Sequence, residues 1–279
     1  MKNTVAEKKD YRYAIVEAVC YWLGYQFKIG RDQLIHEASL RYPIADTITS
    51  RGVSIDRIVL EQLHPIFKSK KIDLVIFDIN TSKTDIENDD TKLKEVFEFK
   101  LAKSKTSEEH SDEHQRVFDD VVRLAYYHSW SSKDCYFLMC GTYEDFKTFF
   151  VGQKNKPTTT QDSKNIVQQK QKSSTQQTSF NVTDLQLSEW KPNGLYKNWF
   201  GFNAGEEKEI SFKKSDNESW GLKPFQESYH IRDSKKLSYT DEIKIKTKCI
   251  NITSGGLENI KTHAAGIWKI EAVKELKKE

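Results

Sequence analysis

The stretch "KLKEVFEFKLAK", residues 92–103, contains the Val and Phe side chains typical of a β-strand. Within it, Glu98 and Lys100 are two residues apart and are flanked by Phe97, Phe99 and Leu101. Because alternate residues of a strand point to the same face, the acid and the lysine share one face. Such a pair indicates either a salt bridge on a strand at the sheet edge or a functional site.

A second strand is predicted just before this one, at "IDLVIFDI", residues 72–79, and the polar residues 80–92 between the two form a long hairpin loop. If the loop centres near residues 85 and 86, Asp73 lies opposite Glu98. Directly opposed residues have Cβ atoms about 4.5–5.5 Å apart, so the two carboxylates would be neighbours. The other acid, Asp78, would be five residues from this pair, or roughly 16 Å along the strand.

Three helices are predicted before the hairpin. Residues 11–27 are apolar nearly all round, which indicates a buried helix. A second helical stretch covers residues 31–48, with Pro43 as a break. Apolar residues at helical spacing predict a third helix over residues 54–67, with Ser54 as its N-cap.

After the hairpin, an amphipathic helix is predicted over residues 111–130, a buried strand over 135–141 and a short helix over 142–150. On the first of these helices, Asp119 and Arg123 have the i, i+4 spacing of a surface ion pair. The order helix, hairpin, helix, strand, helix predicts an α/β fold with a central mixed β-sheet flanked by helices.

The rest of the chain divides by composition. Residues 1–10 are a polar tail, which we expect to be flexible, and 11–152 form the core. Residues 153–182 are rich in Gln, Thr, Ser and Lys, which predicts a disordered insert. Two strand patterns, "EIKIKTKCINIT" and "HAAGIWKIEAV", occur in the C-terminal part, residues 183–279, and predict an elaboration that completes the same sheet.

The overall composition says more about the cellular compartment of the protein than about its binding partner. The net charge of +3 is a small difference between 44 basic and 41 acidic residues, so it neither requires nor excludes nucleic acid. The four cysteines lie in or beside apolar runs without a CxxC pair, which indicates reduced, buried thiols. No segment is long and apolar enough to span a bilayer, so we expect a soluble cytoplasmic protein without a membrane partner.

The residue types at the hairpin have a chemical rationale. Mg²⁺ prefers oxygen ligands and is often held by one or two carboxylates together with waters and phosphate oxygens. Such an ion polarises a phosphate and lowers the pKa of its bound water, and a nearby lysine orients that water or neutralises charge. Without a metal, two adjacent carboxylates would repel each other, and one would stay protonated. Asp73, Glu98 and Lys100 therefore predict a metal-dependent phosphodiesterase site.

Asp73, followed after a hairpin by Glu98-Phe99-Lys100, resembles the pattern of the PD-(D/E)XK nuclease superfamily, although Ile72 replaces the proline of the family name. The resemblance covers residues 11–150. It implies a restriction-endonuclease-like fold, in the order helix, three strands, helix, strand. It also implies a catalytic trio of Asp73, Glu98 and Lys100, with Mg²⁺, or Mn²⁺ as its substitute, bound by the two acids.

The resemblance further implies an acid of the first helix that assists the metal, for which Glu17 is the candidate, and a polar residue in the later helix, where Gln115 falls. It implies hydrolysis of DNA more than RNA, in restriction, defence or DNA processing. From the residues themselves, Lys68, Lys70 and Lys71 next to Asp73 are candidates for substrate phosphate contact.

Other interpretations stay open at this point. The acid and lysine pair could be an edge-strand salt bridge of little energetic value. The chain could be a non-catalytic module that binds nucleic acid or protein on the same fold, or an intracellular toxin that cleaves RNA. A homodimer is also open.

Overall fold

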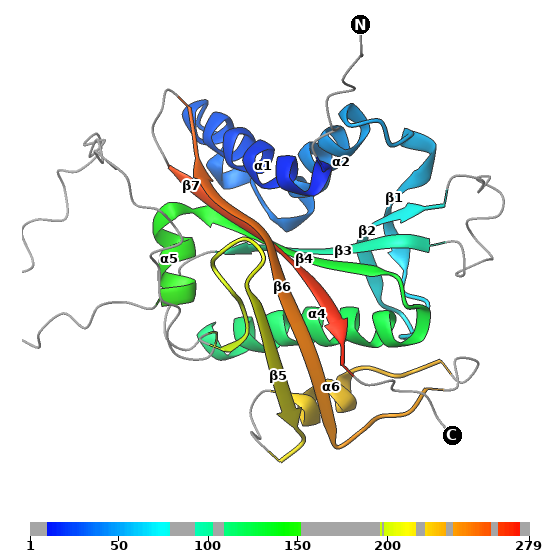
Figure 1. The fold of residues 1–279 in the computed structure, drawn as a ribbon. Coiled ribbons are helices and arrows are strands. Elements are labelled where there is room, and N and C mark those ends of the chain that lie inside the picture. The colour runs from blue at the N-terminus through cyan, green and yellow to red at the C-terminus, as the bar shows by residue number, and fades with distance from the viewer. Residues whose placement is uncertain are drawn as a thin grey trace, which may run out of the picture.

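The computed structural model describes residues 10–78, 93–102, 109–151, 196, 198–215, 221–232, 237–257 and 262–273. Within these residues, helices cover both faces of one sheet (Figure 1). The helices are α1 (Tyr11–Lys28), α2 (Arg41–Ser50), α4 (Glu109–Ser131), α5 (Tyr143–Val151) and α6 (Leu222–Ser228), with 3-10 turns η1 (Asp32–Leu34), η2 (Glu37–Leu40) and η3 (Ile55–Arg57). The strands are β1 (Ile58–Leu63), β2 (Lys71–Phe77), β3 (Leu93–Ala102), β4 (Asp134–Thr142), β5 (Glu207–Lys213), β6 (Glu242–Gly255) and β7 (His263–Ala272).

The described strands form one sheet in the order β1-β2-β3-β4-β7-β6-β5. β3 and β4 run parallel, with α4 as the crossover between them, and the other neighbouring pairs are antiparallel. The predicted mixed sheet flanked by helices is therefore confirmed. The late strands β6 and β7 belong to it, because β7 pairs with β4.

Each face of the sheet carries its own apolar core, and strand alternation assigns the side chains to one or the other. Leu74 and Ile76 of β2 pack toward α1 and α2, whereas Val75 and Phe77 pack toward the face covered by α4. In Figure 1, α1 and α2 lie on one side of the sheet and α4 on the other. This two-sided burial explains why β4 reads as a continuous apolar run.

The helix predicted over residues 54–67 is wrong. The chain makes the short turn η3 and then β1, which pairs with β2 from Ile58 opposite Ile76 to Leu63 opposite Lys71. Ile58 and Val59 are β-branched, and the backbone hydrogen bonds that β2 offers outweigh a weak helical spacing. The three strands β1, β2 and β3 consequently form an antiparallel meander between α2 and α4.

Two other helix predictions need correction in detail. Pro43 does not break a helix, because it lies in the first turn of α2, where a missing N–H costs nothing. The predicted helix over 31–48 instead begins as the 3-10 turns η1 and η2. α1 is buried on one face only, and Tyr21 and Tyr25 on its other face are half exposed.

The predicted insert at 153–182, most of the predicted tail and the hairpin loop at 80–92 lie outside the described residues. None of the helices that the structure describes has the length and apolar character needed to cross a bilayer.

Candidate active site

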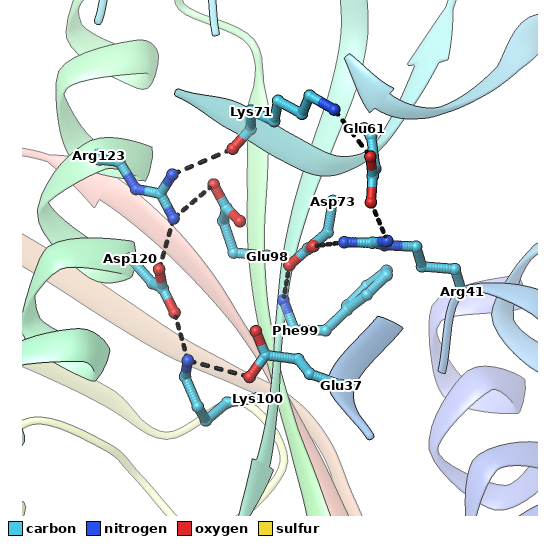
Figure 2. Close-up of polar contacts among 10 residues, drawn as sticks. All are labelled: Glu37, Arg41, Glu61, Lys71, Asp73, Glu98, Phe99, Lys100, Asp120 and Arg123. Atoms are coloured by element: carbon cyan, nitrogen blue, oxygen red, sulfur yellow. Dashed lines mark hydrogen bonds and ion pairs between the residues drawn. The ribbon is translucent and has the colours of Figure 1, made fainter. Parts of the chain in front are cut away.

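The candidate site lies where β2 and β3 separate. Their pairing runs through Ile76 opposite Glu95 and Leu74 opposite Phe97, as predicted, so Asp73 and Glu98 are the next residues on the two strands. The register shifts between Ile76 and Phe77, so Phe77 rather than the predicted Asp78 pairs with Leu93. Beyond the pair of Leu74 and Phe97, a side chain takes the place of the backbone hydrogen bonds between the two strands. Asp73 Oδ2 accepts a hydrogen bond of 2.9 Å from the Phe99 backbone N–H. Figure 2 shows Asp73 between Arg41 and Phe99, Glu98 next to Arg123, and Lys100 between Asp120 and Glu37.

Glu98 is buried, with an exposed fraction of 2%. Its Oε1 lies 3.1 Å from Nη2 of Arg123 on α4, but the contact lacks hydrogen-bond geometry. Burial raises the pKa of Glu98 well above its usual value; Arg123 opposes this shift, whereas Asp73 and Asp120 add to it. The site thus contains more buried negative charge around Glu98 than Arg123 alone offsets.

Lys100 leaves the same face of β3 as Glu98 and is also buried. Its Nζ lies 3.0 Å from Oε2 of Glu37 and 3.3 Å from Oδ2 of Asp120. Burial alone would lower the pKa of Lys100, but the carboxylates of Asp120 and Glu37 outweigh it and raise that pKa. Lys100 is therefore a fixed ammonium group within the site.

Glu37 reaches Lys100 from the 3-10 turn η2. His36 and Ser39 cap this turn reciprocally, and the backbone N–H of His36 donates to Ser39 Oγ at 3.3 Å. Leu40 at its end is fully buried between α2 and the sheet. These contacts explain how a residue 61 positions before Glu98 in the sequence reaches the strand.

Asp73 belongs to a chain of ion pairs that runs to the surface. Its Oδ1 accepts a hydrogen bond of 2.7 Å from Nη2 of Arg41 on α2. Arg41 Nη1 also lies 2.5 Å from Oε1 of Glu61, whose Oε2 lies 2.9 Å from Lys71 Nζ. Glu61 stands next to Asp73 because β1 pairs with β2 in the register that puts Leu60 opposite Leu74.

The predicted lysines and Glu17 differ in how they relate to Asp73 and Glu98. Lys71 joins the network through Glu61, and Lys70 Nζ lies over the Tyr229 ring, 4.3 Å from its centroid. Lys68 is exposed on the turn between β1 and β2. Glu17 is exposed on α1, which packs on β4, β6 and β7, so the structure places it away from Asp73 and Glu98.

Gln115 contacts the C-terminal part of the chain. Its Oε1 accepts a hydrogen bond of 2.6 Å from the Gly221 N–H, and its Nε2 donates to Asp119 at 2.5 Å. Asp119 also accepts a hydrogen bond from the Tyr229 hydroxyl at 3.1 Å. Gln115 therefore holds Gly221, the N-cap of α6, against α4.

The predicted surface pair of Asp119 with Arg123 is wrong. Arg123 is buried and turns inward, where Nη2 lies 2.5 Å from Asp120 and 3.1 Å from Glu98, and Nη1 donates to the Lys71 carbonyl at 3.0 Å. Sequence reasoning also missed Glu37 and Arg41. Both are charged residues, on η2 and at the start of α2, and nothing in the local sequence shows that they reach Lys100 and Asp73 across the fold.

The donor set agrees with a hard divalent cation, although it is small. Two carboxylates of adjacent strands, one with raised pKa and an oxygen that lacks a hydrogen bond, are oxygen ligands of the kind Mg²⁺ prefers. Within the described residues, no group of three His, Cys, Asp or Glu side chains is arranged to hold a metal. A magnesium ion here would thus rest on Asp73 and Glu98 with waters and substrate oxygens as its other ligands.

Comparison with known proteins finds no matching family model, no matching curated protein and no matching solved structure.

Proposed function

We propose that the chain is a restriction-endonuclease-like nuclease that hydrolyses phosphodiester bonds, with DNA as its expected substrate and Mg²⁺ as its cofactor. The observation that carries the proposal is that Asp73 and Glu98 adjoin where β2 and β3 separate, while Lys100 leaves the same face of β3 as Glu98 and shares Asp120 with Arg123, the partner of Glu98. The order of elements also supports it. A helix, the three strands β1 to β3, α4 and then β4 parallel to β3 is the order that the family resemblance implies.

Within this proposal, Asp73 and Glu98 are the residues that would hold the cation by their carboxylate oxygens. When bound, Mg²⁺ supplies polarisation of the phosphate and a water of lowered pKa. Asp73 has Arg41 on one oxygen, so Arg41 must yield that oxygen to the cation or share it. Freed from Asp73, the Arg41 guanidinium is a natural partner for a substrate phosphate, because it can bind two of its oxygens.

Lys100 acts as a cation rather than as a base. Its ion pairs with Glu37 and Asp120 keep it protonated, so it donates hydrogen bonds to the attacking water or to a phosphate oxygen. Arg123 contacts Glu98 from α4 and so positions it, and Arg123 is itself held by Asp120 and by the Lys71 carbonyl. Asp120 therefore links Lys100 with Arg123, and it is a positioning residue.

The experiment is a cleavage assay on purified protein with plasmid DNA and single-stranded RNA, in Mg²⁺, Mn²⁺ or EDTA. We expect cleavage of DNA in either metal and none in EDTA. Glu98→Gln and Lys100→Met should abolish it. Glu95→Gln and Lys94→Met are matched controls on the same strand, outside the site, and circular dichroism should show that all four variants fold.

The competing interpretation is an ion-pair network in a non-catalytic module, which the pairing of each acid with an arginine would also suit. If folded wild-type protein leaves every substrate intact in Mg²⁺ and Mn²⁺, the nuclease proposal fails. If Glu98→Gln and Glu95→Gln lose activity equally, the site assignment fails. Cleavage of RNA alone would select the RNA-cleaving alternative.

A further inference from the structure

A groove of about 640 Å³ opens beside the candidate site, within the range of roughly 300–1,000 Å³ that is common for small-molecule sites. Its walls come from the C-terminal half of α1, the segment with η1 and η2, the start of α2, and β1. Its lining includes Trp22, Arg31, His36, Arg41, Tyr42 and Glu61.

The groove is continuous with the candidate site through two shared residues. Arg41 and Glu61 line the groove, and the same Arg41 guanidinium contacts Asp73 at 2.7 Å. Figure 2 shows Arg41 reaching Asp73 from the side of the helical segments, while Glu61 reaches Arg41 from β1. A phosphate held at Asp73 and Arg41 would thus have the groove as the next space along its strand.

The side chains of the groove combine positive charge with aromatic surface. Arg31 and Arg41 line it against one acid, Glu61, which forms ion pairs with Arg41 and Lys71. Tyr42 is 70% exposed although its ring is large and apolar. Trp22 supplies a second ring. This is the chemistry of a site for a stacked base next to a phosphate.

Duplex geometry decides which form of nucleic acid could use these rings. In a paired helix the base faces are covered by their neighbours, so only an unpaired or flipped base can lie on an aromatic side chain. Grooves that combine cations with stacking aromatics are typical of proteins that bind single strands. A duplex would meet the arginines but leave the rings of Trp22 and Tyr42 unused.

We propose that this groove binds an unpaired nucleotide of the strand that is cut, so that the substrate is single-stranded or is opened next to the scissile phosphate. The inference rests on the proposed nuclease function and specifies its substrate class. Arg41 holds the phosphate between the site and the groove, Arg31 contacts the next phosphate, and Tyr42 and Trp22 stack on the base.

The test measures binding by fluorescence anisotropy, in EDTA so that no cleavage occurs. The probes are a labelled single-stranded DNA, a single-stranded RNA of the same sequence, and the DNA duplex. Tyr42→Ala and Arg31→Gln are the groove variants, because both side chains are exposed and their loss leaves the core intact. Tyr21→Ala is the matched control, since Tyr21 is 55% exposed on α1 but does not line the groove.

We expect tighter binding of a single strand than of the duplex, and a loss of about tenfold in single-strand affinity for Tyr42→Ala, as for one stacked base. Tyr21→Ala should bind as wild type does. Equal losses for single strand and duplex, or none, would overturn the groove assignment. Whichever of the two single strands binds more tightly, the DNA or the RNA, shows whether the groove prefers deoxyribose or ribose.

The cleavage assay separates the two proposals. If Glu98→Gln abolishes cleavage but Tyr42→Ala and Arg31→Gln leave single-strand binding unchanged, the nuclease proposal stands and the groove inference fails. If neither metal supports cleavage by the folded wild type, the nuclease proposal fails whatever the anisotropy shows.

Discussion

Arg123 is the residue on which the charge balance of the site depends, and its replacement by methionine gives the sharpest test of that balance. Methionine keeps the length and the apolar stem but removes the guanidinium that contacts Asp120 at 2.5 Å, Glu98 at 3.1 Å and the Lys71 carbonyl at 3.0 Å. Two buried acids would then have lost their shared counter-charge. Breaking a buried ion pair on one side costs about 3–5 kcal/mol, because the remaining charge is left unpaired.

We therefore expect Arg123→Met to lower the free energy of unfolding by about 3–5 kcal/mol. Glu98→Gln should cost less than Arg123→Met, because Asp120 still pairs with the Arg123 guanidinium when Glu98 is replaced. The double variant should recover part of the loss, with a coupling energy of about 1–3 kcal/mol between residues in contact. Arg123→Lys, which keeps a positive charge, should lie between Arg123→Met and wild type.

Urea unfolding followed by tryptophan fluorescence and by circular dichroism measures these differences. Adding Mg²⁺ should restore more stability to Arg123→Met than to wild type, because a cation at Asp73 and Glu98 replaces the missing charge. Additive effects of the two single substitutions, within about 0.5 kcal/mol, would show that Arg123 and Glu98 are not coupled and would refute the reasoning. A loss below about 1 kcal/mol for Arg123→Met would refute it as well.

Two predictions concern other parts of the fold. His64 is buried, its Nδ1 accepts hydrogen bonds from the backbone N–H groups of Ile66 and Phe67, and burial together with Arg123 and Arg232 lowers its pKa well below the usual value. The unfolded chain therefore binds a proton that the folded chain does not, so the free energy of unfolding should fall as pH drops below about 6.5. In His64→Asn, which keeps an acceptor but does not titrate, urea unfolding at several pH values should show a shallower decline; an identical decline would contradict this role. Gly141 on β4 has no room for a side chain, because a Cβ there would lie 2.6 Å from the carbonyl oxygen of Ala102 on β3. Gly141→Ala should cost about 1–3 kcal/mol in the same assay, and an unchanged unfolding midpoint would contradict the close approach of these strands.

Local sequence was sufficient for the pairing of the two strands and for its register between Leu74 and Ile76, but not for the shift between Ile76 and Phe77. The period of two assigns Glu98 and Lys100 to one face, and the position of the loop assigns Asp73 to Glu98. Both relations depend only on residues close together along the chain. The same holds for the buried strand β4, whose apolar run is continuous over nearly its whole length.

Local sequence failed where a partner distant in the chain decides the outcome. Residues 58–63 form a strand because β2 offers its edge, although their apolar spacing is also compatible with a helix. Arg123 could pair with Asp119 on an isolated helix, but α4 turns it inward, toward Asp120 and the buried Glu98.

The residues of the candidate site divide in the same way between those found from local sequence and those found only in the fold. The sequence alone determined which strands carry the two acids and the lysine, because strand alternation and hairpin pairing are local. Only the tertiary structure decided that Glu37 and Asp120 hold Lys100, that Arg41 holds Asp73, and that a groove opens beside them. These contacts join helices and strands across the two faces of the sheet, and charge neutralisation in a buried site depends on distance in space rather than on distance along the chain.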